Sequence, residues 1–201
     1  MSQRERNRID TWNAVHEAAQ AIAWDEGPQA ATVERIAASA GVSRRTFFNY
    51  FPTKEDAILG TRAPEVTEEA IRRFRGSEAD ELTRVVHLFV AVVRTAIPES
   101  TSAQRRRIIA EHPGLQKRVA LLLSEVERLV AEVIQARVDD GEDVALAQPD
   151  DDQRLEALLM LAGVIAKYAF HRYQDSSSAG DPRHFLEESI AMFREVVDTT
   201  R

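Results

Sequence analysis

The spacing of apolar residues is helical from one end of this chain to the other, and this limits the possible folds more than any other feature. Trp12, Val15, Ala19 and Ile22 recur at intervals of three and four, which places them on one stripe of a helix. We find no stretch of alternating β-branched and polar residues between hairpin turns, the pattern of a half-buried strand. The sequence therefore predicts an all-α protein.

Turn and cap residues divide the first 62 positions into one longer helix and three short ones. Side chains that can bond a free amide at a helix N-terminus stand at Thr32, Ser43 and Thr53, so we expect a helix to begin directly after each. Gly27, followed by Pro28, is expected to end the first helix as a left-handed cap. The later helices are expected to stop at Gly41, Pro52 and Gly60.

Longer apolar-periodic segments follow, separated by residues that stop helices. They lie at about 65–75, 78–97, 101–111, 115–138, 152–174 and 183–198. We therefore expect about nine helices in two domains, with residues 9–62 forming a small N-terminal domain and residues 63–201 a larger helical one.

Composition excludes several classes of protein. Of the 201 residues, 44% are hydrophobic and none is cysteine, so disulfide frameworks, cysteine zinc sites and thiol catalysis are excluded. The N-terminus lacks the apolar core of a signal peptide, and no apolar run approaches the roughly 18 residues of a membrane span. We expect a cytoplasmic protein without membrane contact.

Charge is distributed unevenly, and this keeps nucleic acid among the possible partners. Residues 1–62 hold eight basic and eight acidic side chains, so the formal net charge of −7 comes from the remainder of the chain. Residues 42–54 contain Arg44, Arg45 and Lys54 and no acid. A local positive patch is therefore expected inside an acidic protein.

The segment around this patch has the pattern of a helix-turn-helix motif, at about residues 32–51, with two short helices joined by Ala40-Gly41-Val42-Ser43. On a helical wheel Phe47, Phe48 and Phe51 share one arc, where we expect them to pack against Val15 and Ile36. The opposite arc carries the polar side chains Arg45, Thr46, Asn49 and Tyr50.

This polar arc suits DNA, although by itself it is also compatible with an ordinary solvated face. Arg and Asn match the hydrogen-bonding edges of guanine and adenine, so Arg45 and Asn49 are the candidates for reading bases. Phosphate contacts are expected from residues near helix starts and edges. The predicted DNA contacts are Thr32, Ser43, Arg44, Arg45, Thr46, Asn49, Tyr50 and Lys54.

In these positions the chain resembles the TetR family of bacterial transcriptional repressors. Residue types and spacing agree at Val15, Ala18-Ala19, Ile22, Gly27, Thr32-Val33, Ile36-Ala37, Ala40-Gly41-Val42-Ser43, Thr46-Phe47, Tyr50-Phe51-Pro52 and Lys54-Glu55. The chain differs at Phe48, where the family often has Tyr. Gly60 and Pro64 also interrupt what is commonly a continuous fourth helix in the family.

The resemblance implies a DNA-reading N-terminal domain, a C-terminal domain with a small-molecule pocket, and a homodimer formed through the last two helices. Position alone suggests as pocket residues His87, Phe89, Arg118, Leu122, Tyr168 and Phe170. Apolar and small residues on several faces of the last helices suggest as dimer contacts Leu158, Ala162, Ile165, Ala166, Ala169, Ile190, Phe193 and Val197.

Other patterns do not favour an enzyme or a cofactor. The five histidines show no paired metal-ligand spacing, and there is no glycine-rich phosphate loop. Arg105-Arg106-Arg107 is compatible with three exposed side chains or with a site for the acidic head of an amphipathic effector. We predict a repressor that a largely apolar effector releases from a palindromic operator. The alternative is a helical small-molecule-binding or metabolic protein that carries the motif without regulating transcription.

Overall fold

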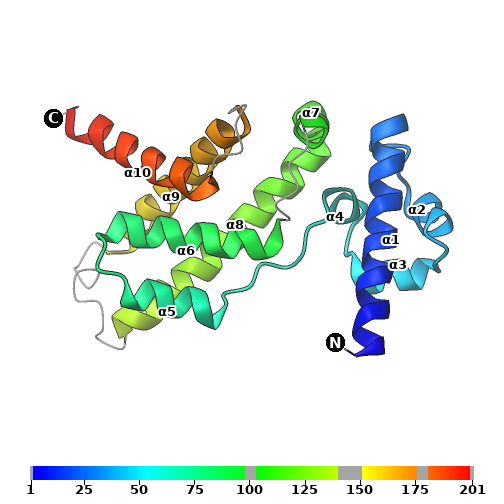
Figure 1. Ribbon diagram of the computed structural model, residues 1–201, viewed down its shortest axis with the longest axis horizontal. Coiled ribbons are helices and arrows are strands. Elements are labelled where there is room, and N and C mark those ends of the chain that lie inside the picture. The colour runs from blue at the N-terminus through cyan, green and yellow to red at the C-terminus, as the bar shows by residue number, and fades with distance from the viewer. Residues whose placement is uncertain (1, 98–102, 140–150, 176–180, 200–201) are drawn as a thin grey trace. The chain divides into compact units, whose positions relative to one another are not determined.

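The computed structural model describes residues 2–97, 103–139, 151–175 and 181–199, and within these ranges every regular element is an α-helix (Figure 1). This confirms the predicted all-α fold, with ten helices in the described part of the chain against about nine expected. The helices are α1 Gln3–Glu26, α2 Val33–Ser39, α3 Arg44–Tyr50, α4 Lys54–Leu59, α5 Glu68–Gly76, α6 Glu81–Ala96, α7 Ala103–Glu111, α8 Pro113–Asp139, α9 Asp151–Asp175 and α10 Pro182–Thr199.

The expected N-caps are all present in the N-terminal helices. The hydroxyl oxygens of Thr32, Ser43 and Thr53 accept hydrogen bonds from the backbone N–H three residues later, at distances of 3.3, 3.0 and 3.1 Å. The conformation expected of Gly27 is wrong. Its φ of 89° is positive, but its ψ of 156° is extended, so α1 does not end in a left-handed cap.

The chain forms two compact units, and the first is discontinuous in sequence. It combines residues 1–63 with residues 96–122, whereas the second combines residues 64–95 with residues 123–201. Helix α7 and the beginning of α8 therefore belong with the N-terminal helices. The division at residue 62 that we expect from the sequence marks only one of the boundaries, because it leaves residues 96–122 in the second domain.

Apolar side chains from α1, α2 and α3 form the core of the first unit. Val15, Ile36, Phe47 and Phe51 are each 0% exposed, which confirms the expected packing of both phenyl rings against α1 and α2. Buried residues of α7 and α8 extend the same cluster, and Ile108 is one of them. The short helices are thus held on a core that a distant segment completes.

The expected burial of Phe48 is wrong, since 46% of this residue is exposed. On a helical wheel the buried face of α3 is centred between Phe47 and Phe51, and Phe48 lies about 60° beyond Phe51. The wheel shows that the three rings share an arc, but it does not show where that arc meets the core. Packing against α1 and α2 leaves Phe48 at its margin.

Helix α4 is short, as Gly60 and Pro64 predict. It ends at Leu59, and Gly60 closes it with a left-handed backbone at φ 63° and ψ 31°. A side chain at Gly60 would have no room, because a Cβ atom built there would lie 2.5 Å from Cε1 of His16. No helix follows until α5, whose N-cap is Thr67.

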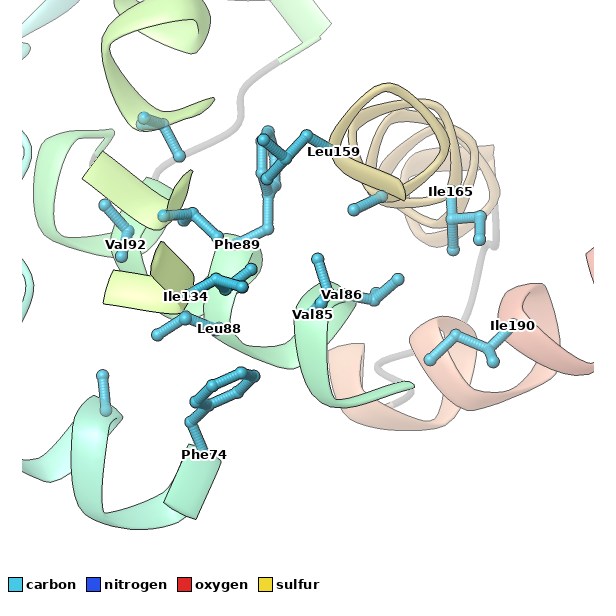
Figure 2. Packing of buried hydrophobic residues seen from close by; sticks show 14 residues of the cluster. Phe74, Val85, Val86, Leu88, Phe89, Val92, Ile134, Leu159, Ile165 and Ile190 are labelled. Carbon is cyan, nitrogen blue, oxygen red and sulfur yellow. The ribbon is translucent and has the colours of Figure 1, made fainter. Parts of the chain in front are cut away.

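The second unit has its own core, built from α5, α6, α8, α9 and α10 (Figure 2). Figure 2 shows Phe74 of α5, a series of α6 residues that includes Val85 and Phe89, and Ile190 of α10 directed toward one another. Ring contacts of Tyr168 with Phe193 and of Tyr173 with Phe185 show that α9 and α10 run antiparallel.

Candidate nucleic-acid interface

Helices α2 and α3 pack against each other through a tight turn. Gly41 adopts a φ of 67°, which only glycine accepts without strain, and Val42 donates its backbone N–H to Ala37 O at 2.9 Å. At the start of α3 the hydroxyls of Ser43 and Thr46 are 2.8 Å apart and share a hydrogen bond. The turn and the cap thus fix the direction in which α3 leaves α2.

The two side chains expected to read bases both lie in solvent. Arg45 and Asn49 are exposed on α3 and one turn apart. Among the residues that the structure describes, neither side chain has a hydrogen-bond or ion-pair partner. Their donors and acceptors are therefore available to a ligand that approaches the outer face of α3.

Next to them lies Arg44, whose guanidinium is held by only one exposed ion pair. Arg44 Nη1 is 2.9 Å from Glu34 Oε1 of α2, and both side chains are more than 60% exposed. An exposed pair of this kind contributes at most about 1 kcal/mol, so Arg44 can exchange Glu34 for a phosphate at little cost. The Arg44 guanidinium also lies over the Phe48 ring, 5.7 Å from its centroid.

The remaining predicted contacts differ in accessibility. Thr32 is exposed, whereas Thr46 and Tyr50 are half-buried. Lys54 is half-buried as well, and its Nζ donates to the backbone carbonyl of Pro28 at 2.9 Å. Lys54 therefore joins α4 to the loop after α1, which is a structural role that the sequence pattern did not indicate.

Arg35 adds an ion pair at the start of α2 that sequence reasoning missed. Its guanidinium binds the Glu26 carboxylate of α1, with Nη2 and Oε1 2.6 Å apart. The hydrogen bond from Arg35 lowers the pKa of Glu26 below its ordinary value. Glu26 thus offsets the charge of Arg35, as Glu34 offsets that of Arg44, and Arg45 is the arginine of the motif without an ion-pair partner among the described residues.

A buried ion pair holds α4 to α8. Asp56 is 2% exposed, and its Oδ1 accepts from Arg118 Nε at 2.6 Å and from the Thr61 hydroxyl at 2.8 Å. Its Oδ2 accepts from the Thr53 hydroxyl at 2.7 Å. Sequence reasoning missed this network, because Arg118 is 62 positions from Asp56 and no local pattern links the two.

The residues suggested for a ligand pocket do not form one cluster. Arg118 and Leu122 belong to the first unit, where Arg118 pairs with Asp56, and the other four belong to the second. Phe89 is 1% exposed and part of the core, whereas His87 is exposed and pairs with Glu187 at 2.8 Å. Tyr168 donates to Met192 Sδ, and Phe170 is 44% exposed. Arg118 is therefore bound to Asp56 within the first unit, and the suggested pocket stays a prediction.

One small cavity of about 140 Å³ lies between α1 and α7, and none of the suggested pocket residues lines it. Of the Arg105–Arg107 series, Arg107 lines this cavity and is 3.8 Å from Glu111, while the side chains of the other two lie outside the description. Within the described residues no cluster of three or more metal-ligating side chains occurs, and none of the described helices could cross a membrane.

Half of the suggested dimer contacts are buried inside the protomer. Ala162, Ile165, Ala169 and Ile190 are at most 6% exposed, and all but Ala169 belong to the core cluster of the second unit. These four cannot touch a partner, so this part of the expectation is wrong. Leu158, Ala166 and Phe193 are half-buried, and Val197 is 54% exposed. The apolar side chains that do reach solvent on these helices are Met160, Val164, Phe170, Met192, Val196 and Val197.

The sequence of α1 to α4 matches one known protein family over part of its length. Residues 16–59 match the family model described as bacterial regulatory proteins, tetR family. These residues are therefore similar to the N-terminal DNA-binding domain of the TetR family. The matched residues run from the middle of α1 to the end of α4, so they contain the whole helix-turn-helix motif. Proteins of the TetR family are DNA-binding transcriptional regulators rather than enzymes.

Two solved structures are similar over most of the chain but only at low TM-scores. One is Thermus thermophilus FadR, a TetR-family transcriptional repressor in complex with lauroyl-CoA, which is 21% identical with a TM-score of 0.39 and covers 90% of this chain and 92% of its own. The other is a putative tetR-family transcription regulator from Shewanella sp. PV-4. It is 20% identical with a TM-score of 0.36, and the match covers 91% of this chain and 95% of that protein. No curated protein matches the sequence.

Proposed function

We propose that this TetR-type chain is a repressor that binds a palindromic operator as a homodimer and leaves it when a small, largely apolar effector binds the second unit. The observation that carries the proposal is the free polar face of α3. Arg45 and Asn49 are exposed there beside Arg44, while Phe47 and Phe51 hold the opposite face in the core. A recognition helix requires this arrangement, in which one face packs in the core and the other is open to the major groove.

The contacts divide into two kinds. Arg45 and Asn49 carry the forked side chains that discriminate guanine and adenine in the major groove, by about 1 to 3 kcal/mol for each good pair. Ser43, Arg44, Thr46 and Tyr50 lie around them and are assigned to phosphates, which set the register of the helix on DNA. Thr32 at the start of α2 and Lys54 at the start of α4 complete the proposed phosphate contacts.

A dimer follows from the geometry of operators. A two-fold protein presents two recognition helices to major grooves about one helical turn of DNA apart, so a palindrome doubles the contact. We assign the dimer surface to the exposed apolar strip Met160, Val164, Met192 and Val196. The Tyr168–Met192 contact places Met192 beside α9, and Val164 and Val196 each lie one helical turn from this contact, Val164 from Tyr168 on α9 and Val196 from Met192 on α10.

The effector is proposed to act through a difference in affinity between two arrangements of the dimer. A ligand that prefers one separation of the recognition helices lowers operator affinity, because operator and ligand then favour different states. An apolar effector is favoured because the helices of the second unit face one another with aliphatic and aromatic side chains, which suit an apolar ligand between them. The site of action is the cytoplasm, where bacterial operators lie.

Selection of DNA from random fragments, followed by binding measurements with variants, tests this function. Arg45→Ala should relax sequence choice at one position, whereas Lys54→Gln should weaken all DNA equally and reduce the salt slope by about one. Glutamine keeps a donor for the carbonyl of Pro28 while it removes the charge. If neither variant changes binding to the selected operator, α3 is not the recognition helix.

The rival function, a helical metabolic or binding protein that merely carries the motif, predicts a different result. Its affinity for DNA would show no preference for the selected operator over random DNA of equal length. The family assignment favours regulation.

A further inference from the structure

We propose that Phe48 reads the C5-methyl group of a thymine in the major groove, as a specificity-determining contact beside Arg45 and Asn49. This inference rests on the proposed function, and it names an operator feature that hydrogen-bonding residues do not detect. Thymine is the base with an apolar group on its major-groove edge, and Phe is among the side chains that can contact it.

The first observation is the position of the ring. Phe48 is 46% exposed although the sequence pattern places it with the two buried phenyl rings. On a helical wheel it lies about 60° from Arg45, on the side away from Asn49. Phe48 therefore flanks the face of α3 that carries Arg45 and Asn49, on the Arg45 side.

The second observation is that the ring is held in place. Its edge meets Phe47 at an interplanar angle of 88° with the centroids 5.3 Å apart, and Phe47 itself is fully buried. Arg44 lies over the ring from the preceding turn. A side chain fixed on two sides loses little conformational entropy when a ligand covers its remaining surface.

The third observation concerns what can cover the ring. Its neighbours on the exposed side of α3 are Arg45, which has no ion-pair partner among the described residues, and Arg44, which is held only by an exposed pair with Glu34. Such a surface attracts a polyanion and disfavours an apolar protein partner, whose approach would desolvate both charges. The ring ends in carbon, so it cannot donate a hydrogen bond to a phosphate oxygen. DNA meets both conditions, because its phosphates suit the arginines and the methyl group of thymine offers the ring an apolar contact.

The experiment replaces single thymines of the selected operator by deoxyuridine, which removes the methyl group and keeps every base-pairing and groove hydrogen bond. Fluorescence anisotropy then gives the affinity of the full-length protein for each DNA. At one symmetry-related pair of positions we expect the wild type to bind about fourfold less tightly per half-site, the loss that corresponds to one buried methyl group.

Phe48→Ala should bind the thymine operator with the same loss and show no further loss with uracil. Phe48→Leu, which keeps an apolar side chain, should retain most of the sensitivity to uracil. Asn49→Ala is the matched control on the same face of α3, and it should weaken binding while the sensitivity to uracil at the Phe48 position persists. Because Phe48 is half exposed, thermal unfolding of Phe48→Ala should stay close to that of the wild type.

Three results overturn the inference while the proposed function stands. The first is selective binding by the wild type that is unaffected by uracil at every position, and the second is an operator without thymine in the half-site. The third is a Phe48→Ala protein that remains as sensitive to uracil as the wild type, which would mean that another side chain contacts the methyl group. If no DNA sequence is selected at all, the proposed function fails together with this inference.

Discussion

At the scale of single residues, Asp56 and Arg118 form a buried ion pair that their neighbours in the sequence do not predict. Asp56 stands where a first-turn acid is expected, yet it is buried and bound by Arg118, Thr61 and Thr53. Its partner Arg118 is 62 positions away. No local pattern reveals such a pair, because the contact exists only once α8 lies beside α4.

Loss of Arg118 should therefore destabilise the first unit strongly. Arg118→Ala leaves the Asp56 carboxylate buried with only its two hydroxyl donors, and we expect the free energy of unfolding to fall by about 2 to 4 kcal/mol. Urea denaturation followed by circular dichroism measures the change. The double variant Asp56→Asn with Arg118→Ala should recover part of the loss, and a double variant no more stable than Arg118→Ala would contradict the assignment.

Gly60 is a second position at which the structure requires a particular residue, in this case glycine. Gly60→Ala combines a left-handed backbone with a Cβ atom that meets the His16 ring, so we expect a loss above about 2 kcal/mol and a lower midpoint of thermal unfolding. Gly41→Ala is the matched control, because Gly41 has a similar φ of 67° and open space around it. Equal losses in the two variants would show that contact with His16 costs nothing.

At the scale of elements, the start of α6 depends on one acidic cap. Asp80 Oδ1 accepts the backbone N–H of Thr83 at 3.2 Å, and Oδ2 accepts the Thr83 hydroxyl at 2.9 Å and a hydrogen bond from Arg194 of α10. Burial alone would raise the pKa of Asp80, but the hydrogen bonds from Thr83 and Arg194 outweigh it and lower the pKa. Asp80 thus joins the beginning of α6 to α10.

A lowered pKa in the folded state stabilises the protein above the unfolded-state value of about 3.9, and the contribution is lost as the pH falls through the folded-state pKa. Asp80→Ala removes the cap and the ion pair, and it should lower the free energy of unfolding by about 1 kcal/mol or slightly more at pH 7. Asp80→Asn keeps a capping oxygen, so its loss should be smaller.

Urea unfolding at pH 7 and at a pH of about 3 distinguishes the two contributions. The gap between wild type and Asp80→Asn should shrink at the lower pH because the Asp80 carboxyl of the unfolded chain, with a pKa near its ordinary value of about 3.9, takes up a proton there and favours unfolding. A gap that is the same at both pH values would show that the charge of Asp80, which Thr83 and Arg194 bind, adds no stability.

At the scale of the whole molecule, α9 and α10 expose large apolar side chains that no contact within the protomer covers. Val164 is 52% exposed, Val196 is 57% exposed and Met160 is 62% exposed, and they lie on two helices that pack against each other. Clustered apolar exposure of this kind marks an interaction surface more often than single exposed residues do. We assign it to a second copy of the chain.

Val164→Glu should therefore shift the protein from dimer to monomer in light scattering at micromolar concentration. Operator affinity should fall with it, since one recognition helix then binds without its partner. Leu121→Glu is the control, because Leu121 is 53% exposed on α8 and outside the strip. A wild-type protein that is monomeric, or a Val164→Glu protein that stays dimeric, would contradict this interface.

The helices and their boundaries follow from the amino-acid sequence alone. The period of the apolar residues and the hydroxyls of Thr32, Ser43 and Thr53 act within one or two turns, so no distant contact is needed to place them. Tertiary packing decided the exposure of Phe48, the pairing of Asp56 with Arg118 and the burial of Ile165 in its own protomer. Each of these contacts depends on which helix packs against which face. A periodic sequence pattern shows that a helix has an apolar face, but it does not show which helix packs against that face.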